Sequence, residues 1–189
     1  MKKLAFFLTV FCTLTSGLAF AQSDLIGPKT ATATLNVKLH PIQTILIGAN
    51  STVDLEYQTK EDYSNGVTKT MNDHLIVYST GGFAVKVKSE NENLVRKEGD
   101  SKIPVNTINL VATLGTGNKS GSTFSAVTLD TSDKNLISSE VGGTDLKFNV
   151  EYSGTGGDAY VNNDYVNKYY NVEKPTVYTT TVTYTIEAQ

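Results

Sequence analysis

The sequence has one cysteine, no tryptophan and four prolines. The single cysteine, Cys12, lies near the N-terminus, and the chain that follows it can form neither a disulfide nor a thiol site. Basic residues are outnumbered, with 16 Lys and Arg against 19 Asp and Glu, which disfavours nucleic acid and anionic membrane surfaces as partners. No segment keeps an apolar period of 3.6 residues, so we expect almost no helix.

The N-terminus has the three parts of a secretory signal peptide. Two lysines precede an apolar run over residues 4–14, and Ala19 and Ala21 form a small-residue cleavage site. We expect cleavage after Ala21, which takes the net charge from −3 to −5, because the leader has two lysines and no acidic residue. Lipidation of Cys12 is the alternative, but the bulky Phe11 before it does not suit a lipoprotein signal.

The predicted location follows from this leader. Its apolar run is shorter than the roughly 20 residues of a membrane span, and no later segment is long and apolar enough to cross a membrane. We therefore predict a secreted protein of the periplasm or cell surface, with no membrane insertion once the leader is removed.

Strict alternation of apolar and polar residues dominates the rest of the sequence. It runs through residues 31–39, 144–152 and 177–188, in β-branched and aromatic types. Eight to ten short strands with turn signals between them predict an all-β fold. We expect a single antiparallel two-sheet β-sandwich, immunoglobulin-like in the broad sense, over residues 31–189, after a flexible lead-in at 22–30.

The turn signals also predict how some strands are joined. Gly81 and Gly82 favour a tight turn. We expect a hairpin of residues 74–79 and 83–89, a strand at 52–57, a polar loop at 58–73, and neighbouring strands at 144–152 and 177–188.

Candidate catalytic groups are few. After the leader the chain has two histidines, His40 and His74, and neither lies in a catalytic or metal-binding motif. The carboxylates lie among Ser, Asn and Lys, which indicates solvated positions rather than the paired carboxylates of a glycosidase. We predict that the protein is not an enzyme, and a hydrolase is the least favoured alternative.

Two oxygen-rich clusters are candidate sites for a structural calcium ion. Neither matches the EF-hand pattern, and ordinary turns use the same residue types. No other cofactor is expected. The candidate ligands are Asp130, Asp133, Asp158 and Asp164.

Tyrosines gather in the long predicted loop over residues 153–175. Tyrosine gives a rigid, amphipathic contact surface that stacks on sugar rings and on proteins. These side chains could bind glycans or peptidoglycan, or they could fold back to cover the end of the sandwich. The candidates are Tyr160, Tyr165, Tyr169 and Tyr170.

Three segments carry a resemblance to known proteins: ATATLNVKLHPIQTILI, HLIVYSTGGFAVKVKS and YTTTVTYTIEAQ. They resemble small bacterial exported β-sandwich proteins, a group that includes secreted families of Bacteroidetes-type bacteria, pilin-type fimbrial subunits and WxL-like surface domains. The chain departs from the WxL group because it has no tryptophan, and from many pilins because it has no disulfide. The resemblance carries over no site residue.

The resemblance implies a structural or adhesive role at the cell surface, with the protein itself, other surface proteins or glycans as partners. In pilin-type assemblies, the N-terminal strand of one subunit fills a groove in the next, and residues 31–39 have the alternation that such a donor strand needs. The simpler interpretation is that residues 31–39 form the first strand of a complete, self-contained sandwich. A glycan-binding module that uses the tyrosine-rich loop is the alternative function.

Overall fold

The computed structural model describes residues 29–48, 50–96, 100–118, 121–161, 165 and 175–189. The chain divides into two units, residues 1–38 and 39–189. The elements in chain order are β1 (Gln43–Ile47), α1 (Lys60–Asn65), β2 (Val67–Ser79), β3 (Phe83–Ser89), β4 (Asn93–Arg96), β5 (Lys102–Pro104), η1 (Val105–Thr107), β6 (Ile108–Leu114), β7 (Ser122–Phe124), β8 (Val127–Thr128), β9 (Lys134–Ser139), β10 (Gly143–Gly154), β11 (Tyr178–Thr179) and β12 (Val182–Ala188).

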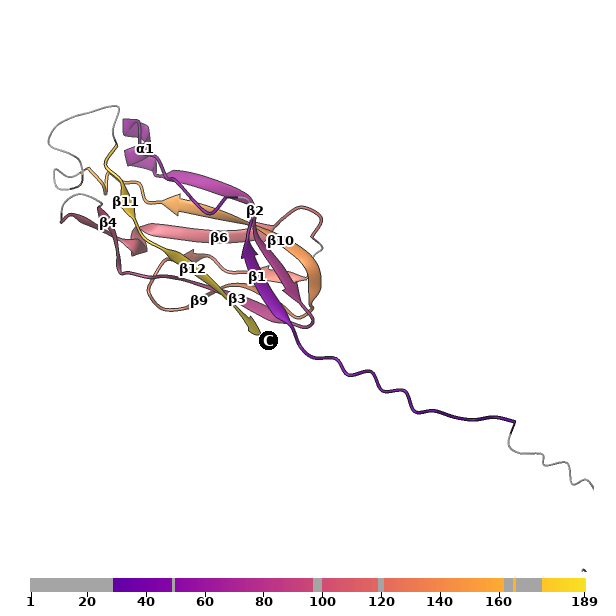
Figure 1. Cartoon of the computed structure of the whole chain (residues 1–189). Coiled ribbons are helices and arrows are strands. Elements are labelled where there is room, and N and C mark those ends of the chain that lie inside the picture. The colour runs from indigo at the N-terminus through magenta and orange to yellow at the C-terminus, as the bar shows by residue number, and fades with distance from the viewer. Residues whose placement is uncertain (1–28, 49, 97–99, 119–120, 162–164, 166–174) are drawn as a thin grey trace, which may run out of the picture. The chain divides into compact units, whose positions relative to one another are not determined.

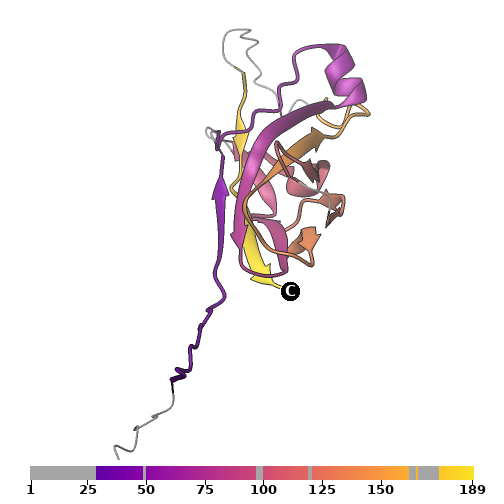
Figure 2. The same ribbon diagram turned by 90° about the vertical axis from the view of Figure 1, so that its right-hand side faces the viewer.

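These strands form three antiparallel sheets. Sheet A has the order β1-β2-β10-β6-β8, sheet B has the order β12-β3-β9-β7, and the small sheet C has the order β11-β4-β5 (Figures 1 and 2). The all-β antiparallel sandwich is therefore confirmed, with three sheets in place of the predicted two.

The hydrophobic core lies between sheets A and B and takes side chains from both. Phe148 of β10 is fully buried, and its ring centroid lies 6.2 Å from that of Phe83 on β3 and 6.2 Å from that of Phe124 on β7. The alternation predicted over residues 144–152 is confirmed in β10, where Phe148 and Val150 are buried, and β6 alternates in the same way with Leu110 and Ala112 buried. Alternation along these strands therefore identified the core correctly.

The predicted polar loop over residues 58–73 is wrong, because it contains a helix and the first half of β2. Thr59 begins α1 with a capping box. Its hydroxyl accepts from the Asp62 N–H at 3.2 Å, while the Asp62 carboxylate accepts from the Thr59 N–H at 2.7 Å. Gly66, at φ 84°, ends the helix in a backbone conformation that suits glycine.

The predicted hairpin of β2 and β3 is also wrong. The two strands belong to different sheets, and residues 80–82 carry the chain from sheet A to sheet B. β2 instead pairs with β1 and β10, and β3 pairs with β12 and β9. A short glycine turn suits a corner between packed sheets as well as a hairpin, so its sequence could not distinguish the two.

The long C-terminal strand predicted over residues 177–188 is interrupted. β11 pairs with β4 in sheet C, whereas β12 pairs with β3 in sheet B. β12 and β10 lie in different sheets, so they are not the predicted neighbours. The alternation itself holds, since Val182, Tyr184 and Ile186 pack against the core.

Two predicted strands are not strands in the structure. Residues 52–57 form no backbone ladder with another strand of the described structure, although Val53 and Leu55 do pack against the core. Residues 31–39 have no regular secondary structure, and all of them are exposed. The interpretation of residues 31–39 as the first strand of the protein's own sandwich is therefore wrong: this segment has the pattern of a strand without a strand partner.

Replacing Phe148 with alanine removes the centre of this aromatic core, and we expect the free energy of unfolding to fall by about 3–5 kcal/mol. Urea denaturation measures the change. Val141→Ala is the control, because Val141 is 61% exposed and should change stability by less than about 0.5 kcal/mol. Equal effects of the two substitutions would contradict the placement of the core.

Candidate assembly edge

β1 is an edge strand of sheet A, and one side of it has no partner among the described residues. The Ile42 carbonyl accepts from the Thr80 N–H at 3.0 Å, and the Gly48 N–H donates to the His74 carbonyl at 2.8 Å. Because ladder bonds alternate along an antiparallel strand, the even-numbered residues of β1 bond to β2. The N–H and C=O groups of Gln43, Ile45 and Ile47 therefore point to the unpartnered side.

β12 is the corresponding edge of sheet B. The Glu90 N–H donates to the Thr181 carbonyl at 2.9 Å, and the Gln189 N–H donates to the Gly82 carbonyl at 3.1 Å. The odd-numbered residues therefore bond to β3. The even-numbered residues point their backbone groups to the other side; these are Val182, Tyr184, Ile186 and Ala188.

β1 and β12 contact each other on one side of the sandwich (Figure 1). We call this side the β1/β12 edge. Its apolar side chains cover the core incompletely: Ile45, Tyr184 and Ile186 are only partly buried, whereas Val85 and Val87 of the adjacent β3 are fully buried. The sandwich thus presents both unpaired backbone groups and half-covered apolar side chains along the same edge.

The segment of residues 31–39 has the complementary properties. Leu35 is 86% exposed, Val37 is 75% exposed and Leu39 is 87% exposed. They alternate with polar residues, and no proline or glycine interrupts them. Every residue of the segment therefore keeps a backbone donor and acceptor for a ladder.

A buried polar cluster lies behind the β1/β12 edge. His74 Nε2 of β2 lies 2.9 Å from the Tyr152 hydroxyl of β10, which in turn hydrogen-bonds the Tyr184 hydroxyl of β12. Burial lowers the pKa of His74 and raises the pKa of Tyr152 to about 12. Burial also raises the pKa of Tyr184, and the nearby Tyr152 adds to that shift. All three groups are thus neutral near pH 7, and they tie β12 to sheet A.

The predicted tyrosine site is only partly within the described residues. Tyr160 is 9% exposed and donates to Thr107 Oγ1 at 2.7 Å. Its ring lies 5.0 Å from that of Tyr57 and 6.4 Å from that of Tyr165, which lies 6.3 Å from Tyr178. Ring contacts thus link these four tyrosines, and both roles considered for the loop stay predictions. Tyr169 and Tyr170 lie outside the described residues.

The acidic clusters are placed in turns and ion pairs. Asp130 accepts from the Thr131 N–H at 2.6 Å and lies 3.6 Å from Lys134 Nζ, and Asp133 lies 3.4 Å from Lys88 Nζ. In the second cluster, Asp158 accepts from Ser64 Oγ at 3.0 Å, and Asp164 lies outside the described residues.

No group of three His, Cys, Asp or Glu side chains in the described part of the chain could hold a metal ion. Calcium binding stays a prediction, and nothing in this geometry adds to it. The two histidines lie in different environments, since His74 is buried and His40 is exposed.

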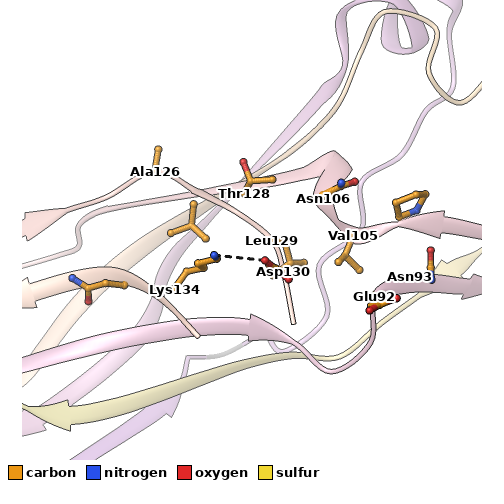
Figure 3. A pocket seen from close by; sticks show the side chains of 12 residues that line it. Glu92, Asn93, Val105, Asn106, Ala126, Thr128, Leu129, Asp130 and Lys134 are labelled. Atoms are coloured by element: carbon orange, nitrogen blue, oxygen red, sulfur yellow. Dashed lines mark ion pairs between the residues drawn. The ribbon is translucent and has the colours of Figure 1, made fainter. Parts of the chain in front are cut away.

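An open pocket of about 720 Å³ lies next to Asp130 (Figure 3). Its lining includes the buried apolar side chains Val105 and Leu129, and the rim includes Glu92 and Lys134. The Asp130–Lys134 ion pair spans part of the rim, so both charges already have partners.

The sequence matches no protein-family model and no curated protein. Among the described residues, no helix has the length and apolarity needed to cross a membrane. The function must therefore be argued from the geometry, and the β1/β12 edge is the most distinctive feature. Alternation in the sequence predicted a strand that includes β12 but could not identify it as an edge strand, because edge and central strands share the same pattern.

The buried His74 predicts a pH dependence of stability. Its pKa is lowered in the folded protein from the ordinary value of 6.5, so the unfolded chain binds more protons below that pH. Stability is fully present above about pH 6.5 and falls as the pH decreases, by at most about 1.4 kcal/mol per pH unit from this group. Urea denaturation between about pH 7.5 and 5 measures the slope.

His74→Gln is the matched variant for this slope, because glutamine can hydrogen-bond Tyr152 but does not titrate. His40 and all carboxylates remain unchanged. The variant should show a flatter pH dependence than the wild type over the same range. An identical slope in both proteins would show that His74 does not control it.

Proposed function

We propose that this protein is an exported, non-enzymatic structural subunit that assembles with copies of itself by strand donation. Residues 31–39 of one copy would lie along the β1/β12 edge of another. One observation supports this proposal above all. Residues 31–39 are exposed, have the pattern of a strand and have no strand partner among the described residues, and the sandwich has an edge at which apolar side chains are only partly buried.

The pattern of the segment suits the edge. Ala31, Ala33, Leu35, Val37 and Leu39 share one face, and an added strand can turn this face to the core while its backbone bonds to the edge. In β1 and β12, the residues whose side chains face the core are also the residues whose backbone N–H and C=O groups point away from the neighbouring strand. A donor strand beside β1 would thus pair at Ile45 and help to cover the side chains of Tyr184 and Ile186 on the adjacent β12.

The free energies of burial and of ordering indicate that many contacts must act together to hold a donor strand. Burying one Val or Leu side chain contributes about 1.5–3 kcal/mol, whereas ordering each residue of the segment costs about 1–2 kcal/mol. The three large apolar residues of the donor do not offset the ordering of nine residues alone. Backbone bonds and the newly covered side chains of the acceptor supply the rest, so loss of one large apolar contact should weaken assembly strongly.

The N-terminal leader supports export, which an extracellular subunit requires. Residues 1–21 have the charged, apolar and small-residue parts of a secretory signal, and the remaining chain has no cysteine. The polar outer residues of the segment, such as Asn36 and Lys38, keep it soluble before assembly. The glycan-binding alternative gains no comparable support, because Tyr160 is buried and its ring contacts that of Tyr57.

The test is a matched pair of substitutions in the exposed segment. Leu35→Asp places a charge on the apolar face, whereas Asn36→Asp places the same charge on the polar face one residue later. We expect Leu35→Asp to weaken self-association at least tenfold, because the lost burial alone corresponds to about 1.5–3 kcal/mol. Asn36→Asp should assemble nearly as the wild type does.

Sedimentation velocity over a range of concentrations measures the association of residues 22–189 in each form. At a concentration at which each form is monomeric, far-UV circular dichroism should be the same for the wild type and both variants, because residues 35 and 36 have no regular secondary structure in the single chain. A wild type that stays monomeric at all concentrations would overturn the proposal, as would equal association of the two variants.

A further inference from the structure

The connection between the exposed segment and β1 is only residues 40–42 long. A strand with so short a connection to an unpaired edge would ordinarily fold back along that edge as a hairpin. Self-closure of this kind would cover the edge and end assembly. The inference below rests on the proposed function. If copies assemble by strand donation, some feature of the chain must prevent the segment from closing onto the edge of its own molecule.

Ile42 fixes where any such hairpin would have to turn. Its N–H donates to Thr80 Oγ1 at 3.0 Å, and its carbonyl accepts from the Thr80 N–H at 3.0 Å. Both backbone groups of Ile42 therefore face β2. Gln43 is the first residue of β1 whose backbone groups are directed to the unpartnered side, so a returning strand must begin its ladder there.

A two-residue turn gives the wrong face to the core. It would pair His40 with Gln43, and the ladder would continue with Lys38 opposite Ile45. Directly opposed residues of an antiparallel pair point to the same face. Lys38 and Asn36 would then point to the core beside Ile45, and the apolar side chains of the segment would point to solvent.

The two-residue turn is also excluded by its backbone. Pro41 and Ile42 would be its central residues, and the hairpin turns that match strand twist need a positive φ at the first central residue. The ring of proline fixes φ near −65°. Pro41 therefore prevents this turn independently of the face that it would present.

A three-residue turn would restore the correct face, because Leu39 would lie opposite Gln43 and Val37 opposite Ile45. Such turns place two residues in the right-handed region and the third at positive φ. Pro41 in the second position disfavours the right-handed conformation of His40. Ile42 in the third position would need a positive φ, which β-branched residues avoid. Longer turns with the correct face remove Leu39 from the ladder.

We propose that residues 40–42 prevent segment 31–39 from closing onto the β1/β12 edge of its own chain, and so reserve the segment for a second copy. Three features act together: the two bonds from Ile42 to Thr80, the fixed φ of Pro41, and the odd-numbered inward positions of both the segment and β1. A donor segment from another molecule is not joined to β1 by a turn, so it can pair in the register that directs its apolar side chains to the core.

The test builds a turn that permits closure. The triple substitution His40→Pro, Pro41→Asp, Ile42→Gly gives the Pro-Asp-Gly sequence that suits a three-residue turn with the correct face. A control with alanine at the same three positions removes the wild-type side chains without supplying a turn. Each is compared with the wild type as the full chain expressed with its own leader, by sedimentation velocity and thermal unfolding.

We expect the wild type and the alanine control to associate, and the turn variant to be a monomer with a higher unfolding midpoint. Adding Leu35→Asp to the turn variant should remove the gain in midpoint, because the closed segment would then place a charge at the core. A second variant with eight Gly and Ser residues inserted between Leu39 and His40 frees the connection without touching Ile42. It should also become monomeric, because a short flexible linker gives the donor an effective concentration in the millimolar range.

The outcomes separate the two proposals. If the wild type, the turn variant and the insertion variant all associate equally, the inference about residues 40–42 is wrong and strand donation stands. If the wild type is monomeric at every concentration, strand donation itself fails, and the inference that rests on it fails as well.

Discussion

An incompletely covered core is the constraint on which the rest of this structure depends. Sheets A and B enclose Phe148 and its neighbours, yet along the β1/β12 edge the inward side chains of Ile45, Tyr184 and Ile186 remain partly exposed. The same residues direct backbone donors and acceptors away from their sheets. An edge with both properties is unfavourable in water and invites a further strand. Residues 31–39 are exposed, have the pattern of a strand and lie in no sheet of the described structure.

The His74–Tyr152–Tyr184 cluster gives the open edge its local order. Tyr184 lies on an edge strand, and its hydroxyl reaches across the sandwich to Tyr152, which is next to His74. This connection, together with the contact between β1 and β12, holds β12 against sheet A. A second group of tyrosines is linked by ring contacts that run from Tyr57 through Tyr160 and Tyr165 to Tyr178.

Much of the fold could be predicted from alternation, and the failures have physical causes. The patterns of β10 and β12 gave the correct inward faces, because the period of side chains along a strand is a local property. Pairing is not local, so the β2–β3 hairpin and the β10–β12 neighbours were wrong. The Thr59–Asp62 capping box signalled α1 within a segment predicted as a loop. Residues 31–39 could not be placed from sequence, since an own strand and a donated strand have the same pattern.

The most direct test is hydrogen exchange of a chain that starts at Pro41, with and without the peptide ATATLNVKL. Strand donation predicts that the peptide binds and slows exchange at the amides of Gln43, Ile45 and Ile47 of β1, while the amides of the β8 edge do not change. If the peptide does not bind, or if those three amides exchange equally fast in its presence, the β1/β12 edge is not the acceptor and the account is contradicted.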